Sequence, residues 1–246
     1  METNYSKHAA YWDWDLYDNS KDIEFWFTMS EKYGKNILSP MCAIGKSAAY
    51  LAYKGLNVTA LDYTEEMILE GKKRFGNIEY LNFVQEDIRY FKLCRQYDFC
   101  FIDGSDIHLL PSIEDVKLAL LNINGHLRSG GGLGVELVYP FKESHFAHMK
   151  RFDPRVPRND CITWKEGDSY YNAVTKKQVI HQYLFIKKDE EIDCIEHFVN
   201  LQYYDREEIF DTFQVCGFKI VGQYCDRMFN KGDKQNENCF IELEKI

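Results

Sequence analysis

The first half of the chain alternates short apolar segments with segments of helical spacing, and this alternation constrains the fold more than any other feature. The apolar segments are expected to be strands, at 36–38, 57–61, 79–84, 97–102 and 133–138. Between them lies helical spacing, as at 46–54 and at 113–127. Such alternation predicts a parallel sheet with helices on both faces. Ligands of such sheets bind beyond the carboxyl ends of the strands, near the point where the strand order reverses.

From Tyr139 onward the pattern changes to an antiparallel one. Strands are expected at 170–176, 178–187 and 196–203, followed by a helix at 206–215 and two closing strands at 218–224 and 238–244. We therefore expect an α/β fold: a doubly wound, mostly parallel, Rossmann-like seven-stranded sheet with an antiparallel β insertion and an N-terminal helical lid. The expected parts of this single domain, 1–246, are a lid at 1–35, a cofactor-binding core at 36–138, a substrate-side insertion at 139–204 and a closing part at 205–246.

Composition excludes several classes of protein. The 246 residues are 45% hydrophobic, which is enough for a substantial core and excludes a disordered chain. A formal charge of −9 without a basic cluster argues against nucleic acid and favours neutral or cationic ligands. No apolar run approaches the ~18 residues that cross a bilayer, and the start lacks a secretory pattern, so we expect a cytoplasmic protein without a membrane partner. The eight cysteines, without C-x-x-C, indicate reduced thiols and no metal site.

The segment 37–67 reads as a strand, a tight turn, a helix and a second strand that ends in an acidic residue. The turn contains the small residues Ser39, Cys42 and Gly45, which would let a ligand approach the backbone. Asp62 stands at the tip of the second strand, where a carboxylate can accept hydrogen bonds from both hydroxyls of a ribose. The alternative is an ordinary exposed aspartate at a strand end.

These residues resemble the class I methyltransferases that use S-adenosylmethionine, and the pattern is most similar to small-molecule, amino-sugar type N-methyltransferases. The resemblance covers almost the whole chain. It is carried by DYTEEM at 62–67, EDI at 86–88, DGSDIHL at 103–109 and LRSGG at 127–131. It implies S-adenosylmethionine as cofactor, S-adenosylhomocysteine as product, and an adenine site at Asp87 and Ile88. The cofactor-binding residues that it implies are Tyr11, Tyr17, Ser39, Cys42, Gly45, Asp62, Tyr63, Met67, Asp87, Ile88, Asp103 and Ser105.

The turn departs from the family pattern. Where the family usually has an acidic residue and three glycines, this chain has Ser39, Met41, Ala43 and Gly45. The missing carboxylate would ordinarily help to hold the amino-acid end of the cofactor. Side chains at Met41 and Ala43 are expected to be tolerated only at negative φ. A dinucleotide-dependent dehydrogenase is the nearest competitor, but it would need G-x-G-x-x-G, which is absent.

The N-terminal segment is rich in aromatic residues. Phe25 and Trp26 are expected to lie on a helix that docks on the core. Tyr17, with Asp18, resembles a pair that covers the cofactor sulfonium in small-molecule methyltransferases, where a cation over an aromatic face is stabilised. Tyr11 and Tyr17 are therefore the candidate lid residues.

Methyl transfer requires alignment of nucleophile, methyl and sulfur and exclusion of water, with a base only if the acceptor arrives protonated. The candidate bases are His108 and Asp160. The alternatives are a hydrogen-bonded loop histidine and a solvated loop aspartate. By resemblance, the acceptor pocket is expected in the insertion, although a charged loop with its own small core is as consistent with the sequence. The candidate acceptor residues are Arg155, Arg158, Trp164, Tyr170 and Tyr183.

The sequence thus predicts an S-adenosylmethionine-dependent methyltransferase that acts by in-line transfer on nitrogen, or oxygen, of a small metabolite or natural-product intermediate. One alternative is a peptide N-terminal methyltransferase of a natural-product pathway, with a short peptide as acceptor. Another is a non-catalytic cofactor-binding or scaffold protein, which the altered turn suggests. A monomer and a homodimer are both consistent with the sequence.

Overall fold

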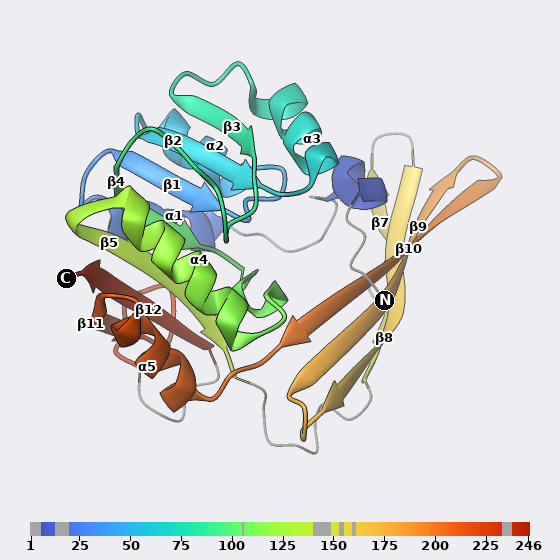
Figure 1. The fold of residues 1–246 in the computed structure, drawn as a ribbon. Coiled ribbons are helices and arrows are strands. Elements are labelled where there is room, and N and C mark those ends of the chain that lie inside the picture. The colour runs from blue at the N-terminus through green and yellow to red at the C-terminus, as the bar shows by residue number, and fades with distance from the viewer. Residues whose placement is uncertain are drawn as a thin grey trace.

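The computed structural model describes residues 6–12, 20–104, 106–139, 149–152, 155–158, 161–232 and 238–246. Its main sheet has seven strands in the order β11-β12-β5-β4-β1-β2-β3 (Figure 1). Strands β1 to β5 pair in parallel, whereas β12 pairs antiparallel with β5 and with β11. The predicted doubly wound, mostly parallel sheet is confirmed. The strands are β1 (Asn36–Pro40), β2 (Asn57–Asp62), β3 (Leu81–Gln85), β4 (Tyr97–Ile102), β5 (Leu127–Val138), β11 (Phe218–Tyr224) and β12 (Asn238–Lys245).

Helices cover both faces of this sheet. The residues of α1 (Ser20–Ser30), α2 (Lys46–Tyr53) and α3 (Glu65–Phe75) contribute to one apolar cluster, and those of α4 (Ile113–His126) and α5 (Arg206–Val215) to another on the opposite face. The predicted docking of Phe25 and Trp26 on the core is confirmed, because both side chains are buried. Two 3-10 helices, η1 (Ser6–Tyr11) and η2 (Asp106–Leu109), lie near the carboxyl ends of the strands.

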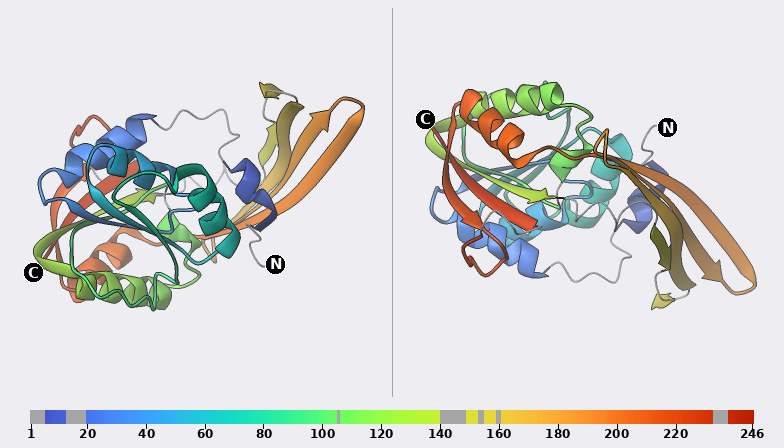
Figure 2. Two further views of the ribbon diagram at one scale, coloured as in Figure 1. Left: turned by 90° about the horizontal axis from the view of Figure 1, so that it is seen from above. Right: turned by 90° about the horizontal axis from the view of Figure 1, so that it is seen from below.

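The insertion forms a second sheet in the order β10-β9-β8-β6, with β7 paired to β8. Figure 2 shows this sheet projecting from one end of the main sheet. Its strands are β6 (Met149–Phe152), β7 (Val156–Arg158), β8 (Cys161–Asn172), β9 (Lys177–Lys188) and β10 (Glu191–Gln202). The antiparallel prediction is confirmed, but the bounds of the expected strand at 170–176 are wrong. Its true counterpart β8 begins at Cys161, where charged residues on a half-exposed sheet hide the apolar alternation.

The glycines at 130–132 lie within β5, which begins at Leu127 and not at 133 as the sequence led us to expect. The pairing of β4 with β5 shifts register between Tyr97 and Phe99, so the extra residues bulge. A Cβ on Gly132 would lie 2.5 Å from the Tyr33 ring, and one on Gly134 would lie 2.5 Å from Trp26. The glycines of β5 therefore let the aromatic side chains of α1 and the segment after it approach the sheet backbone.

The N-terminal 3-10 helix η1 packs against α3. Arg74 of α3 donates a hydrogen bond from Nη2 to the carbonyl of Ala10 at 2.7 Å. Ala9 joins Ile44 and Met67 in a small apolar cluster. This contact places η1 beside the turn that follows β1. Within the described residues, no helix is both long and apolar enough to cross a membrane.

Candidate functional site

The turn between β1 and α2 has the backbone of a glycine-rich turn, although two of its three left-handed positions are not glycine. Met41 has φ 56°, Ala43 has φ 49° and Gly45 has φ 76°. The expectation that Met41 and Ala43 keep negative φ is therefore wrong. Left-handed backbone costs a residue with a Cβ on the order of 1–2 kcal/mol, so surrounding contacts must hold the turn in this conformation.

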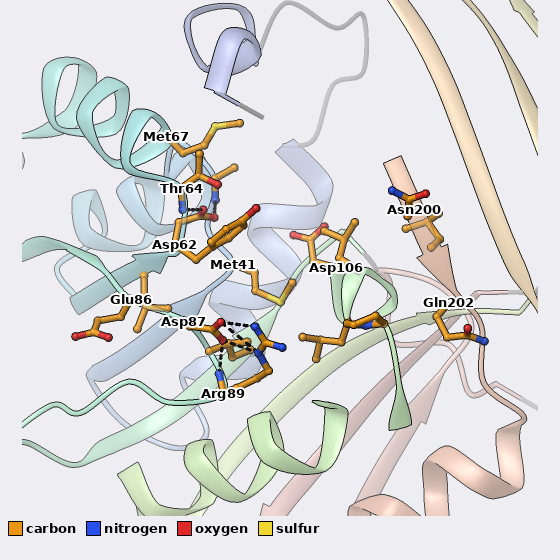
Figure 3. Close-up of a pocket in the computed structure, with 18 of the residues that line it drawn as sticks. Met41, Asp62, Thr64, Met67, Glu86, Asp87, Arg89, Asp106, Asn200 and Gln202 are labelled. Carbon is orange, nitrogen blue, oxygen red and sulfur yellow. Dashed lines mark hydrogen bonds and ion pairs between the residues drawn. The ribbon is translucent and has the colours of Figure 1, made fainter. Parts of the chain in front are cut away.

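Asp62, at the end of β2, holds this turn. Its Oδ2 accepts a hydrogen bond from the Ala43 N–H at 2.8 Å and its Oδ1 accepts one from the Thr64 N–H at 2.9 Å (Figure 3). Burial raises the pKa of Asp62, and the backbone donors partly oppose this shift. A carboxylate has about four acceptor positions, so each oxygen keeps a lone pair that can face a ligand in the cavity.

Three cavities adjoin above the carboxyl ends of β1, β2 and β4. The first, of about 680 Å³, lies over the end of β2 and reaches the ends of β9 and β10. The second, of about 420 Å³, lies over the turn after β1 and is also lined by residues of η1 and the second sheet. The third, of about 320 Å³, lies between η2 and β10.

Most predicted cofactor residues come together at the first two cavities. The first is lined by Asp62, Tyr63, Met67, Asp87 and Ile88. The second is lined by Tyr11, Ser39, Cys42 and Asp103. Gly45 lies in the turn itself, where a Cβ would come within 2.5 Å of the Phe83 ring. The structure thus gathers at one place residues that are spread over much of the sequence.

Asp87 already has a cationic partner. Arg89 donates to both of its oxygens, with Nη2 2.6 Å from Oδ2, and its Nη1 lies 2.6 Å from Oδ1 of Asp115. Hydrogen bonding to Arg89 lowers the pKa of Asp87. The predicted contact of Asp87 with the adenine amino group stays a prediction, and it requires a lone pair that this ion pair leaves free.

Asp103, at the end of β4, is fixed by neighbours from two helices. Trp26 Nε1 donates to Oδ1 and Ser47 Oγ donates to Oδ2, both at 2.7 Å. Since both oxygens have protein donors, Asp103 links α1 and α2 to the floor of the second cavity. Ser39 is buried beside it, at the position where the resemblance led us to expect an acidic residue.

His108 is buried in η2 and both of its ring nitrogens have backbone partners. Nδ1 lies 3.0 Å from the carbonyl of Gln202 and Nε2 accepts from the Val138 N–H at 3.1 Å. Burial lowers the pKa of His108 to about 4. Because neither nitrogen is free to take a proton from an acceptor, this geometry fits the hydrogen-bonded loop histidine better than the predicted base.

The predicted acceptor residues of the second sheet do not line these cavities. Lys165, Gln182 and Leu184 line the second cavity, and their strand neighbours Trp164 and Tyr183 alternate onto the other face. There Trp164 stacks on Phe185 at 5.0 Å between ring centroids, with Arg155 over its ring, and Tyr170 is half exposed. The role of these residues in acceptor binding stays a prediction, and a strand of mixed polarity does not show which side is covered.

Several cavity residues were missed by the sequence reasoning. Asp106 and Trp12 stand beside residues that were chosen, in DGSDIHL and YW, and the resemblance gave no role to either. On the second sheet the missed residues are Lys165, Lys177, Gln178, Val179, Gln182, Leu184, His197, Val199, Asn200, Leu201 and Gln202. Tyr17, Ser105 and Asp160 lie outside the described residues, and for Arg158 only the backbone, in β7, is described.

Part of the chain that forms this site is similar to a known protein family. Residues 37–131, which contain the turn, Asp62 and β4, match the family model described as a methyltransferase domain. This segment of the chain is therefore similar to methyltransferase domains. Over 240 residues it is also 22% identical to YqeM of Bacillus subtilis, which carries a provisional methyltransferase name. That match covers 97% of this chain and 92% of YqeM.

Solved structures share the fold over nearly the whole length. A crystal structure of an S-adenosylmethionine-dependent methyltransferase from Clostridium acetobutylicum matches with a TM-score of 0.81 and 16% identity, over 98% of each chain. The sugar N-methyltransferase KedS8 from a Streptoalloteichus species matches with a TM-score of 0.78 and 13% identity, over 98% of this chain and 93% of KedS8. The chain therefore shares the Rossmann-like fold of these structures over nearly its whole length.

Proposed function

We propose that this chain transfers a methyl group from S-adenosylmethionine to nitrogen, or oxygen, of a small molecule. The observation that carries the proposal is the turn after β1. Positions 41, 43 and 45 all have left-handed φ, although two of them are not glycine, and Asp62 holds the turn by a backbone hydrogen bond. A chain that only needed to fold would have little reason to keep two strained residues at the floor of a cavity.

The cavities suggest how the cofactor would lie. The first cavity offers Asp62 to the ribose hydroxyls, and the apolar side chains Met67 and Ile88 to the adenine ring. The second cavity offers the turn backbone and the start of α2 to the methionine part. When bound there, S-adenosylmethionine would supply an activated methyl group on a sulfonium.

The residues of this chain would then act mainly by position. They would hold the acceptor in line with the methyl group and keep water away from it, which is where most of the acceleration of such a transfer can arise. η1 and the second sheet close the second cavity from above, with Tyr11, Gln182 and Leu184 among its walls. A small acceptor fits this enclosed arrangement, and KedS8, which has the same fold, is a sugar N-methyltransferase.

The cofactor assignment is tested by titrating S-adenosylhomocysteine into the full chain by calorimetry. We expect Asp62→Ala to weaken binding at least tenfold. The variant lacks the charged acceptor of two hydrogen bonds from the ligand, and the turn loses the hydrogen bond between the Ala43 N–H and Asp62. Glu66→Gln, an exposed acidic residue in the first turn of α3, serves as the control and should leave affinity unchanged. Equal affinity of Asp62→Ala and the wild type would refute the ribose assignment.

The reaction is tested by incubating the protein and S-adenosylmethionine with matched panels of amines, phenols and short peptides, and detecting methyl gain by mass. Methylation of small amines or phenols is the expected result. Methylation of peptide N-termini alone would support the peptide alternative. Binding of cofactor without transfer to any acceptor in a cell extract would support the non-catalytic alternative.

A further inference from the structure

Among the described residues, Trp12 and Asp106 are the two that line all three cavities. Met41 and Ala43 line only the first two. In the proposed arrangement the first cavity takes the adenosine, the second takes the methionine part, and the third opens toward the acceptor side. Their junction is then the place where the sulfur, its methyl group and the acceptor nitrogen meet.

Asp106 differs from Asp62 and Asp103 in that its side chain has no hydrogen-bond donor among the described residues. Asp62 accepts from two backbone N–H groups, and Asp103 accepts from Trp26 and Ser47. The side chain of Asp106 accepts no hydrogen bond from the described residues, and its backbone N–H donates to the Asp103 carbonyl at 3.1 Å. Figure 3 shows it between Asp62 and Asn200. At the junction of the three cavities, the Asp106 carboxylate is therefore available to a ligand.

The surroundings of Asp106 favour a positively charged ligand. Burial, together with the carboxylates of Asp103, Asp62 and Glu136, raises the pKa of Asp106 well above its usual value. A cation at this point would be attracted by all of these groups and would favour the ionised form of Asp106. The ring of Trp12 lines the same junction, and an indole face attracts a cation as well.

We propose that Asp106, beside the ring of Trp12, binds the amino group of a small cationic acceptor at the transferred methyl group and takes up the proton that this amine loses. The inference rests on the proposed function. The bound ammonium first gives one proton to the Asp106 carboxylate, which frees the nitrogen lone pair. The lone pair then forms the new N–C bond while the C–S bond breaks, with its electron pair going to sulfur, and the positive charge passes from the sulfonium to the methylated ammonium, so charge and atoms balance.

The test uses calorimetry on the full chain with three cofactor-related probes. S-adenosylhomocysteine has the methionine ammonium, 5′-methylthioadenosine lacks it, and sinefungin has an additional amino group on the carbon that replaces the methylated sulfur. We expect Asp106→Asn to weaken sinefungin at least tenfold and S-adenosylhomocysteine less than threefold, with methylthioadenosine unchanged. The matched control is Asp193→Asn, an exposed carboxylate on β10, which should change none of the three affinities.

Other outcomes overturn the inference in distinct ways. Equal losses for sinefungin and S-adenosylhomocysteine, with methylthioadenosine unchanged, would mean that Asp106 binds the methionine ammonium. No loss for any probe would mean that Asp106 faces no ligand. If Asp106→Asn misfolds and binds none of the three probes, the affinities are measured on Trp12→Leu instead. Equal affinity for sinefungin in Trp12→Leu and the wild type would then refute the site. A wild-type protein that binds none of the probes would refute the proposed function itself.

Discussion

At the residue scale, the molecule keeps a strained turn where its function is proposed. Met41 and Ala43 hold left-handed backbone angles that glycine would adopt without cost. The resemblance identified these positions, but the sequence could not give their φ values, because side chains at glycine positions normally indicate that the backbone has changed. In this structure the turn has the left-handed backbone of a glycine-rich turn although Met41 and Ala43 are not glycine. The Asp62 carboxylate accepts a hydrogen bond from the Ala43 N–H.

This strain predicts an unusual effect of a glycine substitution. Ala43→Gly should increase the free energy of unfolding by about 0.5–1 kcal/mol, since the relief of left-handed strain exceeds the entropy cost of glycine. Ala49→Gly, inside α2, is the matched control and should lower it by about 1 kcal/mol or more. Urea unfolding measures both. An Ala43→Gly variant as unstable as Ala49→Gly would show that the turn carries no strain.

Asp106 also shows how far single residues could be predicted. The sequence reasoning chose Asp103 and His108 on either side of it, and the structure shows both committed to protein partners. Asp106 could be recognised only from the structure, in which the side chains of Asp103 and His108 already have hydrogen-bond partners within the protein. Hydrogen-bond partners far away in the chain, such as Trp26 for Asp103, carry no local signal in the sequence.

At the element scale, strand β5 depends on glycine for contact with α1. Gly134→Ala would place a Cβ 2.5 Å from the buried Trp26 ring, so it should lower the free energy of unfolding by about 1–3 kcal/mol. Gly125→Ala, near the end of α4 with nothing within 4 Å of the new Cβ, should instead raise it by about 0.5–1 kcal/mol. Thermal unfolding of both variants checks the pair, and a shift of the same sign in both would contradict this packing.

The docking of η1 against the second sheet should depend on pH. His8 of η1 lies edge-on to His197 of β10 at 4.2 Å between ring centroids, and its Nε2 is buried with no hydrogen-bond partner in the part of the chain that the structure describes. Burial, with His197 and Lys165 nearby, lowers the pKa of His8 to about 4. The unfolded chain, with a pKa near 6.5, therefore binds the proton first as the pH falls, and folding stability decreases between pH 6.5 and 4.

For His8 this loss amounts to about 2 kcal/mol between pH 7.5 and pH 5. His8→Phe keeps a ring of similar shape and removes the titrating group. Urea unfolding at the two pH values should show a loss in stability that is smaller by about 2 kcal/mol in this variant than in the wild type. An identical pH dependence in both proteins would show that His8 is not buried in its neutral form.

The elements themselves were largely predictable, and the exceptions share a cause. The parallel strands and the main helices follow clear apolar periodicity, and α5 has the bounds that the sequence predicted, Arg206–Val215. β8 and the covered face of the second sheet were not predictable, because both faces of its strands carry polar and aromatic residues. Only the pairing of Lys165 with Leu184 across β8 and β9 shows which side meets the cavity.

At the scale of the whole molecule, the carboxyl ends of β1, β2 and β4 face η1 and the second sheet across three adjoining cavities. The loop after β4 is tied to the second sheet and the segment after it, through His108 with Gln202 and through Tyr204 with the Leu110 carbonyl at 2.6 Å. These hydrogen bonds fix the cavity wall formed by the second sheet relative to the cavity floor formed by the main sheet. The composition indicated enough apolar residues for a substantial core, and it carried no signal for the cavities, which lie where two sheets meet.

The most direct test of this account is a crystal structure of the full chain with S-adenosylhomocysteine bound. The account predicts ribose hydroxyls within hydrogen-bond distance of Asp62, adenine between Met67 and Ile88, and sulfur at the junction lined by Trp12 and Asp106. Cavities that stay empty over the turn at Met41, or a ligand whose ribose lies away from Asp62, would contradict it.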